Sequence, residues 1–200
     1  PAGLPGIWRS CASEKEPGNV PGDEAFIGCL HSVFYEKVYA DRKEKVTPMR
    51  VLVLSDTHRS LGYACECIER ESPDVVLHLG DHLSDAEELS YAYDEPDFYY
   101  VPGNCDCAPT VQPSLTLELG GVRIFMTHGH LFGVKQDVSA LLARAKELGA
   151  QIALFGHTHI AMLEQREGVW LMNPGTAGRL GRTGCGVIEI QDGSFRCRLE

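Results

Sequence analysis

The apolar positions of the chain fall in short runs separated by stretches of helical periodicity. Residues 50–55, 74–79 and 97–101 are apolar runs rich in valine, leucine and aromatic residues, as in strands that are buried on both faces. Residues 63–71 are predicted to form a helix that ends before Pro73, and the capping pattern Ser84-Asp-Ala-Glu87 predicts that another helix begins there. This region therefore predicts a βαβαβ unit with parallel strands.

The second half of the sequence predicts antiparallel pairing and a third helix. Residues 114–119 and 122–127 flank a Gly-Gly pair, the signature of a two-residue hairpin turn. Residues 135–148 carry one apolar stripe at helical spacing and are followed by a further apolar run. Short strands with turns at Glu167-Gly168 and Asp192-Gly193 complete the chain. We expect an α/β sandwich, in which two sheets pack face to face with helices outside.

The N-terminal part of the chain follows a different pattern. Its first 22 positions contain eight proline and glycine residues, and no strand or helix period extends far. An apolar patch at residues 25–39 could form a short helix that docks on the domain. The sequence therefore predicts a poorly ordered extension, residues 1–48, followed by one folded domain, residues 49–200.

The composition argues against several classes of protein. Lys and Arg total 18 against 28 Asp and Glu, so the formal net charge of −10 makes duplex nucleic-acid binding unlikely. No apolar stretch approaches the roughly 20 residues of a membrane span, and no export leader is evident, so we expect a cytoplasmic protein without membrane contact. The eight cysteines are scattered through the sequence, which favours reduced thiols over a disulfide scaffold.

Seven side chains with metal-binding groups follow the predicted strands at the point where each strand ends. In an open α/β sheet the carboxyl ends of the strands line a single crevice, so these groups should converge. Taken singly, a strand-end Asp or His is more often a cap or turn residue, but seven at five successive strand ends indicate one site. The seven are Asp56, His58, Asp81, Asn104, His128, His157 and His159.

The mixture of carboxylate, imidazole and amide donors indicates the kind of ion. It suits Mn²⁺, Fe²⁺, Zn²⁺, Ni²⁺ or Co²⁺ better than Ca²⁺ or Mg²⁺, which prefer oxygen ligands throughout. Seven donors exceed the capacity of one ion, and a bridging carboxylate allows two divalent ions to share them. Our assignment places Asp56, His58 and His159 on one ion and Asn104, His128 and His157 on the other, with Asp81 bridging.

Two such ions, roughly 3.5–4 Å apart, can activate a bridging hydroxide and clamp the oxygens of a phosphoryl group. Asp81, Asn104 and His130 are the residues expected to act in catalysis, His130 by orienting a ligand or donating a proton, with simple packing as its alternative. His78 is expected in the core or behind the ligands, and His82 in a turn or beside the substrate. The site thus predicts hydrolysis of a phosphoester.

Five motifs in this order resemble those of the calcineurin-like metallophosphoesterases. They are Asp56-Thr-His58, Gly80-Asp81, Gly103-Asn104, Thr127-His-Gly-His130 and Gly156-His-Thr-His159. The segments Gly103-Asn-Cys-Asp106 and Asn173-Pro-Gly-Thr176 are most similar to the small bacterial and archaeal YfcE-type phosphodiesterases. The resemblance covers residues 49–200 and implies a four-layer α/β sandwich, a two-metal site and Mn²⁺ dependence.

One residue departs from the family pattern. Cys105 stands where many larger relatives have a histidine that helps to protonate the leaving oxygen, and a thiol is a poor acid at neutral pH. We therefore expect a phosphodiesterase acting on a small phosphorylated substrate. The sequence leaves open a phosphomonoesterase or nucleotide pyrophosphatase, and a non-catalytic scaffold resembling the retromer subunit of this fold. Homo-oligomers are common in such families, so the oligomeric state is open as well.

Overall fold

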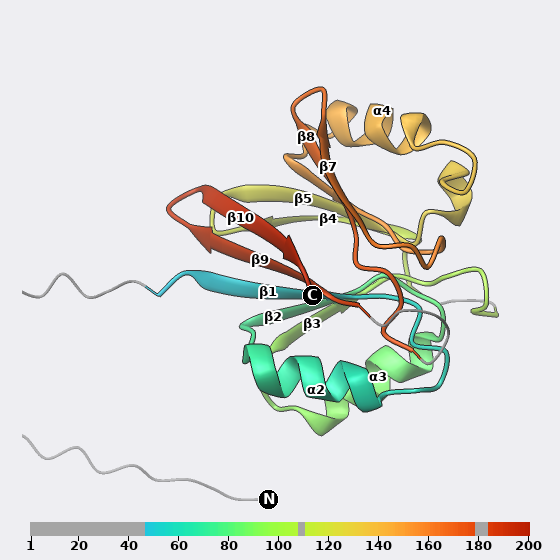
Figure 1. Cartoon of the computed structure of the whole chain (residues 1–200), viewed down its shortest axis with the longest axis vertical. Helices are drawn as coiled ribbons and strands as arrows, with labels where there is room; N and C mark the ends of the chain where they lie inside the picture. Colours follow the sequence, from blue (N-terminus) through green and yellow to red (C-terminus); the bar gives the residue numbers. More distant parts are fainter. Residues whose placement is uncertain (1–46, 108–110, 179–183) are drawn as a thin grey trace, which may run out of the picture. The chain divides into compact units, whose positions relative to one another are not determined.

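The computed structural model describes residues 47–107, 111–178 and 184–200 (Figure 1). Within it, Val46–Glu200 form one compact unit. The predicted extension at residues 1–48, with its short helix at residues 25–39, falls almost wholly on residues 1–46 and so lies outside the described residues. In the described part of the chain, no helix is both long enough and apolar enough to cross a membrane.

The first sheet has five strands in the order β10-β9-β1-β2-β3. Three neighbouring strands are parallel, as the predicted βαβαβ unit requires, and two antiparallel strands from the end of the chain join them at β1. The strands are β1 (Met49–Leu54), β2 (Val75–His78), β3 (Asp97–Tyr100), β9 (Gly186–Gln191) and β10 (Ser194–Leu199). Helices α2 (Gly62–Glu71) and α3 (Leu83–Ala92) connect the parallel strands.

The second sheet also has five strands, in the order β4-β5-β6-β8-β7. Its three central strands are parallel, and an antiparallel strand closes each edge. The strands are β4 (Ser114–Leu119), β5 (Val122–Thr127), β6 (Ile152–Leu154), β7 (Met162–Arg166) and β8 (Val169–Asn173). A short 3₁₀ helix, η1 (His130–Phe132), and helix α4 (Ser139–Glu147) lie between β5 and β6.

The alternation of side chains along β1 shows how the layers are held together. Val51 and Val53 are fully buried in the core between the two sheets, whereas Leu52 and Leu54 are fully buried against the helices. Figure 1 shows α2 and α3 covering the outer face of the first sheet and α4 covering the outer face of the second. The predicted four-layer α/β sandwich, with two mixed sheets and flanking helices, is therefore confirmed.

The tight turns also follow the sequence prediction. Gly120 and Gly121 join β4 to β5 with φ angles of 53° and 81°. Glu167-Gly168 joins β7 to β8, and Asp192-Gly193 joins β9 to β10, again with positive φ at every position. Successive residues with positive φ match the twist of a two-residue hairpin, which glycine, Asp and Asn tolerate best.

Two predicted helix starts are wrong. Helix α3 begins at Leu83, one residue before the predicted capping Ser84, and Leu83 donates its N–H to Asp106 Oδ1 at 2.7 Å. A carboxylate from a distant loop thus replaces the local cap. Helix α4 begins at Ser139, not at Lys135, because residues 133–137 form a turn in which the Gly133 carbonyl accepts the N–H groups of Gln136 and Asp137.

Candidate metal centre

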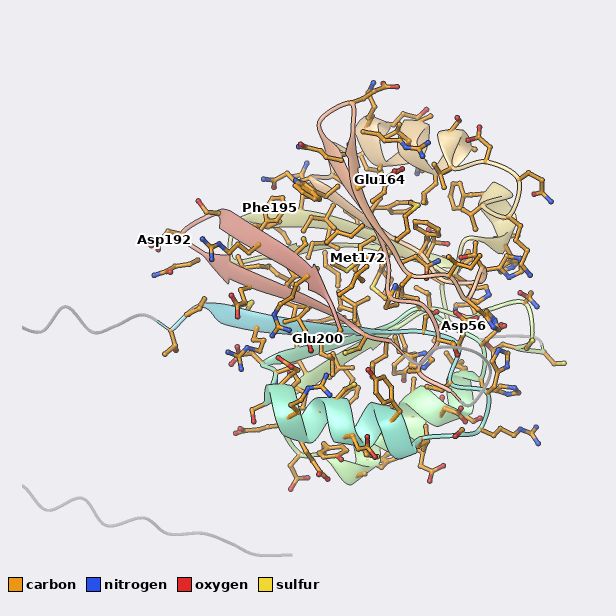
Figure 2. The ribbon with its side chains drawn as sticks, viewed as in Figure 1. Asp56, Glu164, Met172, Asp192, Phe195 and Glu200 are labelled. Atoms are coloured by element: carbon orange, nitrogen blue, oxygen red, sulfur yellow. The ribbon has the colours of Figure 1, made fainter. Side chains whose placement is uncertain are left out.

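The seven side chains singled out in the sequence all lie at one end of the two sheets. Figure 2 shows Asp56 at this end, and the Asp192 turn between β9 and β10 at the opposite end. Asp56 and His58 follow β1, Asp81 follows β2, Asn104 follows β3, His128 follows β5, and His157 and His159 follow β6. The first sheet contributes two carboxylates, the amide and the imidazole of His58, and the second sheet contributes three imidazoles.

Four of these residues form a compact group of potential ligands. The ligand atoms of Asp56, His58, Asp81 and His159 all lie within 4.8 Å of one another. His159 Nε2 is 3.0 Å from Asp56 Oδ1, and His58 Nε2 is 3.8 Å from Asp81 Oδ2. Both carboxylates are almost completely buried, while the two imidazoles are partly open to solvent. This group contains the three residues assigned to one ion together with the proposed bridging aspartate.

The remaining three residues gather on the other side of Asp81. His128 Nε2 lies 3.4 Å from Asp81 Oδ1 and 3.1 Å from Asn104 Oδ1. The His157 ring is centred 5.0 Å from the His128 ring. His128 is fully buried and Asn104 is exposed, so this side of the centre opens to solvent through the loop after β3.

The hydrogen bonds bring several potential ligand atoms close together. His128 Nδ1 is 2.8 Å from the Leu79 carbonyl oxygen, which can only accept, so Nδ1 carries a hydrogen and Nε2 is the ring atom available to a metal. Nε2 faces the side-chain oxygens of Asp81 and Asn104. Buried Asp56 Oδ1 has no hydrogen-bond partner among the described residues. Buried, converging acceptors of this kind fit cations, which would satisfy all of them together.

The ionisation of two of these residues suits metal binding. Burial, the largest influence, raises the pKa of Asp81, but the Cys105 amide N–H and neighbouring His128 outweigh it and hold that pKa below its usual range. Burial, then neighbouring His128 and Lys135, lower the pKa of His157 to about 4. At neutral pH Asp81 is therefore an anion and His157 a neutral imidazole, the forms that coordinate metals.

The backbone is strained at five of the seven residues. Non-glycine residues rarely adopt positive φ, and clusters of such residues are typical of functional sites. The strained residues are Asp56 (55°), His58 (46°), Asp81 (58°), His157 (66°) and His159 (59°). The left-handed conformation turns each side chain back into the crevice immediately after its strand ends.

Two glycines allow the loops to approach the carboxylates closely. A Cβ atom on Gly103 would lie 2.1 Å from Asp81 Oδ1, and one on Gly156 would lie 2.0 Å from Ser55 Oγ and 2.7 Å from Asp56 Oδ2. The glycines of the Gly-Asn and Gly-His motifs are therefore required by the packing of the carboxylates.

A chain of hydrogen bonds behind the site fixes the loop after β1. Gly80 N–H donates to His78 Nδ1 at 3.3 Å, so neutral His78 presents Nε2–H to the Thr57 hydroxyl at 3.2 Å. That hydroxyl donates to Asp85 Oδ2 at 2.7 Å, which also accepts the Arg59 N–H. Burial lowers the pKa of His78 to about 4, which keeps the ring neutral. His78 thus lies in the core behind the ligands, as the sequence predicts.

The segment after β8 supports both halves of the centre. Asn173 donates through Nδ2 to the Gly156 carbonyl at 2.9 Å and to the Thr158 hydroxyl at 3.0 Å. The Thr176 hydroxyl donates to the Asp56 carbonyl at 2.7 Å. The predicted turn at residues 173–176 therefore positions the loops that carry the ligands.

Three further residues border the centre. The ring of His130 is centred 5.4 Å from that of His128, and its buried Nδ1 has no hydrogen-bond partner within the described chain. His82 is partly exposed, with its ring 5.4 Å from His58. Cys105 is exposed; partial loss of water around its sulfur, with Asp81 beside it, raises its pKa to about 11. Its thiol is therefore a weak acid at neutral pH.

The sequence prediction missed the supporting roles of Asp85, Asp106 and Thr57. Asp85 falls inside the pattern that predicts a helix cap, but it accepts hydrogen bonds from the loop after β1 instead. Asp106 accepts N–H groups from Leu83 and Gly103. Most of their contacts join residues that are 20 or more positions apart in the sequence, so a local pattern does not indicate them. The one signal was the motif Gly103-Asn-Cys-Asp106, which contains Asp106.

Comparison with known proteins gives relatives that match the folded unit. The chain is 40% identical over 131 residues to the probable metallophosphoesterase YsnB of Bacillus subtilis, which covers 64% of this chain and 75% of YsnB. It is 34% identical over 84 residues to the phosphodiesterase YfcE of Escherichia coli, which covers 38% of this chain and 42% of YfcE.

The fold is also similar to that of the zinc complex of Vps29 from Entamoeba histolytica. The TM-score is 0.61 at 22% identity, over 76% of this chain and 98% of Vps29. At this identity the likeness concerns the fold alone. The profile of the calcineurin-like phosphoesterase superfamily domain matches residues 49–193, which include all seven side chains of the candidate centre. The chain therefore belongs to the calcineurin-like phosphoesterase superfamily, as its five motifs predict.

Proposed function

We propose that this protein is a two-metal phosphodiesterase whose ions are held by the seven residues at the ends of the strands. The observation that carries the proposal is the convergence of potential ligand atoms around Asp81, with His58 and His128 on its two oxygens at 3.8 and 3.4 Å. The two oxygens of Asp81 face imidazoles of both groups, which supports its role as the bridge. Asp56, His58 and His159 hold one ion, and Asn104, His128 and His157 hold the other.

When bound, two such ions supply a bridging hydroxide as the nucleophile and positive charge for the phosphoryl oxygens. The residues of the chain then provide position and charge. Asp56 and Asp81 contribute two negative charges, so a centre with two dications and a hydroxide keeps about +1 and attracts phosphate despite the acidic protein. His130, next to His128, is placed to orient the phosphate or to pass a proton.

The donor set supports a transition metal, with Mn²⁺ as the ion we propose. Four imidazoles, two carboxylates and one amide suit Mn²⁺, Fe²⁺, Co²⁺, Ni²⁺ or Zn²⁺, while Mg²⁺ and Ca²⁺ prefer oxygen throughout. The partly exposed ligands His58, His157 and His159 leave room for water or substrate at the centre.

The direct test is metal removal followed by reconstitution. We expect the chelated protein to be inactive, and Mn²⁺ to restore hydrolysis of bis(4-nitrophenyl) phosphate more strongly than hydrolysis of 4-nitrophenyl phosphate. A preference for the monoester would favour the phosphomonoesterase alternative. A metal-loaded protein that cleaves neither these esters nor a nucleotide pyrophosphate would instead favour a scaffold, against which the complete set of donors argues.

The diester preference is attributed to Cys105. A thiol with a raised pKa cannot protonate a poor leaving group at neutral pH, so Cys105→His should raise kcat on alkyl esters by about tenfold or more. The measurement is kcat on 4-nitrophenyl and alkyl phosphodiesters for the two proteins. Cys107→His is the matched control, because Cys107 is an exposed cysteine two residues further along the same loop. Equal rates on alkyl esters for the Cys105→His variant and the wild type would remove this explanation of the substrate preference.

A further inference from the structure

An apolar groove of about 540 Å³ reaches the loop that carries His157 and His159, where Thr158 lines it. Its size falls within the range of small-molecule pockets, about 300–1,000 Å³. The apolar residues that line it are Val134, Val138, Phe155, Ile160, Ala161 and Met162. Ile160 is 71% exposed, so the groove presents apolar surface to solvent in a protein of strongly acidic composition.

The walls of the groove are continuous with the loops that carry the histidines. Thr158 lines the groove and lies between His157 and His159 in the sequence. On the other wall, Val134 and Phe155 pack around Gly129: a Cβ atom there would lie 2.8 Å from Val134 Cγ2 and 3.4 Å from Phe155 Cβ. Gly129 separates His128 from His130. A ligand in this groove would therefore lie next to a phosphoryl group at the centre.

Among the described residues that line the groove, Lys135 is the one with a charged side chain. An ammonium group beside an apolar surface suits an anionic ester whose substituent is apolar, and it disfavours a substituent with a positive charge of its own. The groove thus has chemistry complementary to an aryl or alkyl phosphoester.

The position of the groove indicates which substituent it would hold. All residues that line it belong to the connections and strands of the second sheet, from Val134 to Met162. Cys105, to which the preference for good leaving groups is attributed above, follows β3 of the first sheet. We therefore expect the leaving group beside the first sheet, whereas the groove belongs to the second sheet.

We propose that this groove binds the apolar, preferably aromatic, substituent that stays on phosphorus when the diester is cleaved. This inference rests on the proposed phosphodiesterase function and specifies its substrate class: diesters with one bulky, uncharged, apolar group. Burial of that group against the lining residues would supply affinity that a methyl group cannot provide.

The test in turnover compares two diesters with the same leaving group, bis(4-nitrophenyl) phosphate and methyl 4-nitrophenyl phosphate. For each protein, the kcat/KM of the bis(4-nitrophenyl) ester is divided by that of the methyl ester, with the Mn²⁺-loaded full chain. Comparing this ratio between the wild type and each variant cancels the difference in intrinsic reactivity of the two esters. Ala161→Trp, which fills the groove from an exposed position, should lower this ratio about tenfold, and Ile160→Ser should lower it in the same direction. Leu131→Ser is the matched control: Leu131 is a 64% exposed leucine that does not line the groove, and the ratio should not change.

A second measurement separates the groove from catalysis. Phenylphosphonate and methylphosphonate carry no ester to hydrolyse, so their dissociation constants on the Mn²⁺-loaded protein report binding alone. We expect phenylphosphonate to bind about tenfold more tightly, and Ala161→Trp to remove the difference. The inference would be overturned if the two phosphonates bound equally well or if neither bound. It would also be overturned if the Ala161→Trp variant still preferred phenylphosphonate. If no ester is hydrolysed but the phenyl preference depends on Ala161, the proposed function fails and the groove assignment stands.

Discussion

Asp81→Asn is expected to lose tight binding of both metal ions and more than about a hundredfold in kcat. Changes to residues that only orient metal ligands already cost about 10- to 100-fold, and Asp81 contacts both groups of ligands directly. The amide has one oxygen where the carboxylate has two, and it removes a negative charge from between the ions. Metal content by elemental analysis and steady-state hydrolysis of bis(4-nitrophenyl) phosphate provide the two measurements.

Asp192→Asn provides the matched control for this substitution. Asp192 is exposed in the turn between β9 and β10, at the far end of the sheets from Asp56 (Figure 2), and asparagine tolerates its φ of 50°. We expect full metal content and turnover in this variant. Full turnover in Asp81→Asn itself would show that the assignment of Asp81 as the bridge is wrong.

Gly103→Ala should damage the centre without changing any proposed ligand. The added methyl group would lie 2.1 Å from Asp81 Oδ1 and 2.4 Å from the Asp81 amide nitrogen, so either the carboxylate or the loop after β3 must move. We expect a loss of about 1–3 kcal/mol in the free energy of unfolding, as is typical of overpacking. We also expect turnover to fall at least about tenfold, since the bridge is displaced.

Chemical denaturation and metal titration of the variant test this prediction. The same substitution at Gly62 is the control, because Gly62 opens α2 with no atom within 4 Å of the added methyl group. There the substitution should stabilise the protein slightly, by up to about 1 kcal/mol, since alanine restricts the unfolded chain. A Gly103→Ala protein with wild-type stability and metal affinity would contradict the close approach described for this loop.

The strands and the convergence of the site could be predicted because the signals are local. The last four residues of β1, Val51 to Leu54, are all apolar, so the burial of the strand between two layers follows from a few neighbouring residues. Each potential ligand directly follows such a run, and the geometry of parallel strands brings their ends together. The Gly-Gly and Asp-Gly turns are equally local, because they depend on residues that accept positive φ.

The parts that the sequence prediction missed depend on contacts between distant segments. The cap of α3 comes from Asp106, which is 23 residues from Leu83 in the sequence. A local capping pattern at Ser84 cannot indicate a cap from so distant a residue. The start of α4 depends on the turn at residues 133–137 that follows η1, which the apolar spacing does not reveal. The left-handed φ angles of Asp56 and His159 have no sequence signature at all, because neither residue type demands them.

The division of the ligands between the two sheets links metal occupancy to tertiary structure. Asp56, Asp81 and Asn104 come from one sheet, and the imidazoles of His128, His157 and His159 come from the other. Bound ions would therefore connect the two sheets, and the free energy of metal binding would stabilise the packing of one sheet against the other. By the same linkage, a substitution in the core between the sheets, far from any ligand, would weaken the affinity for metal.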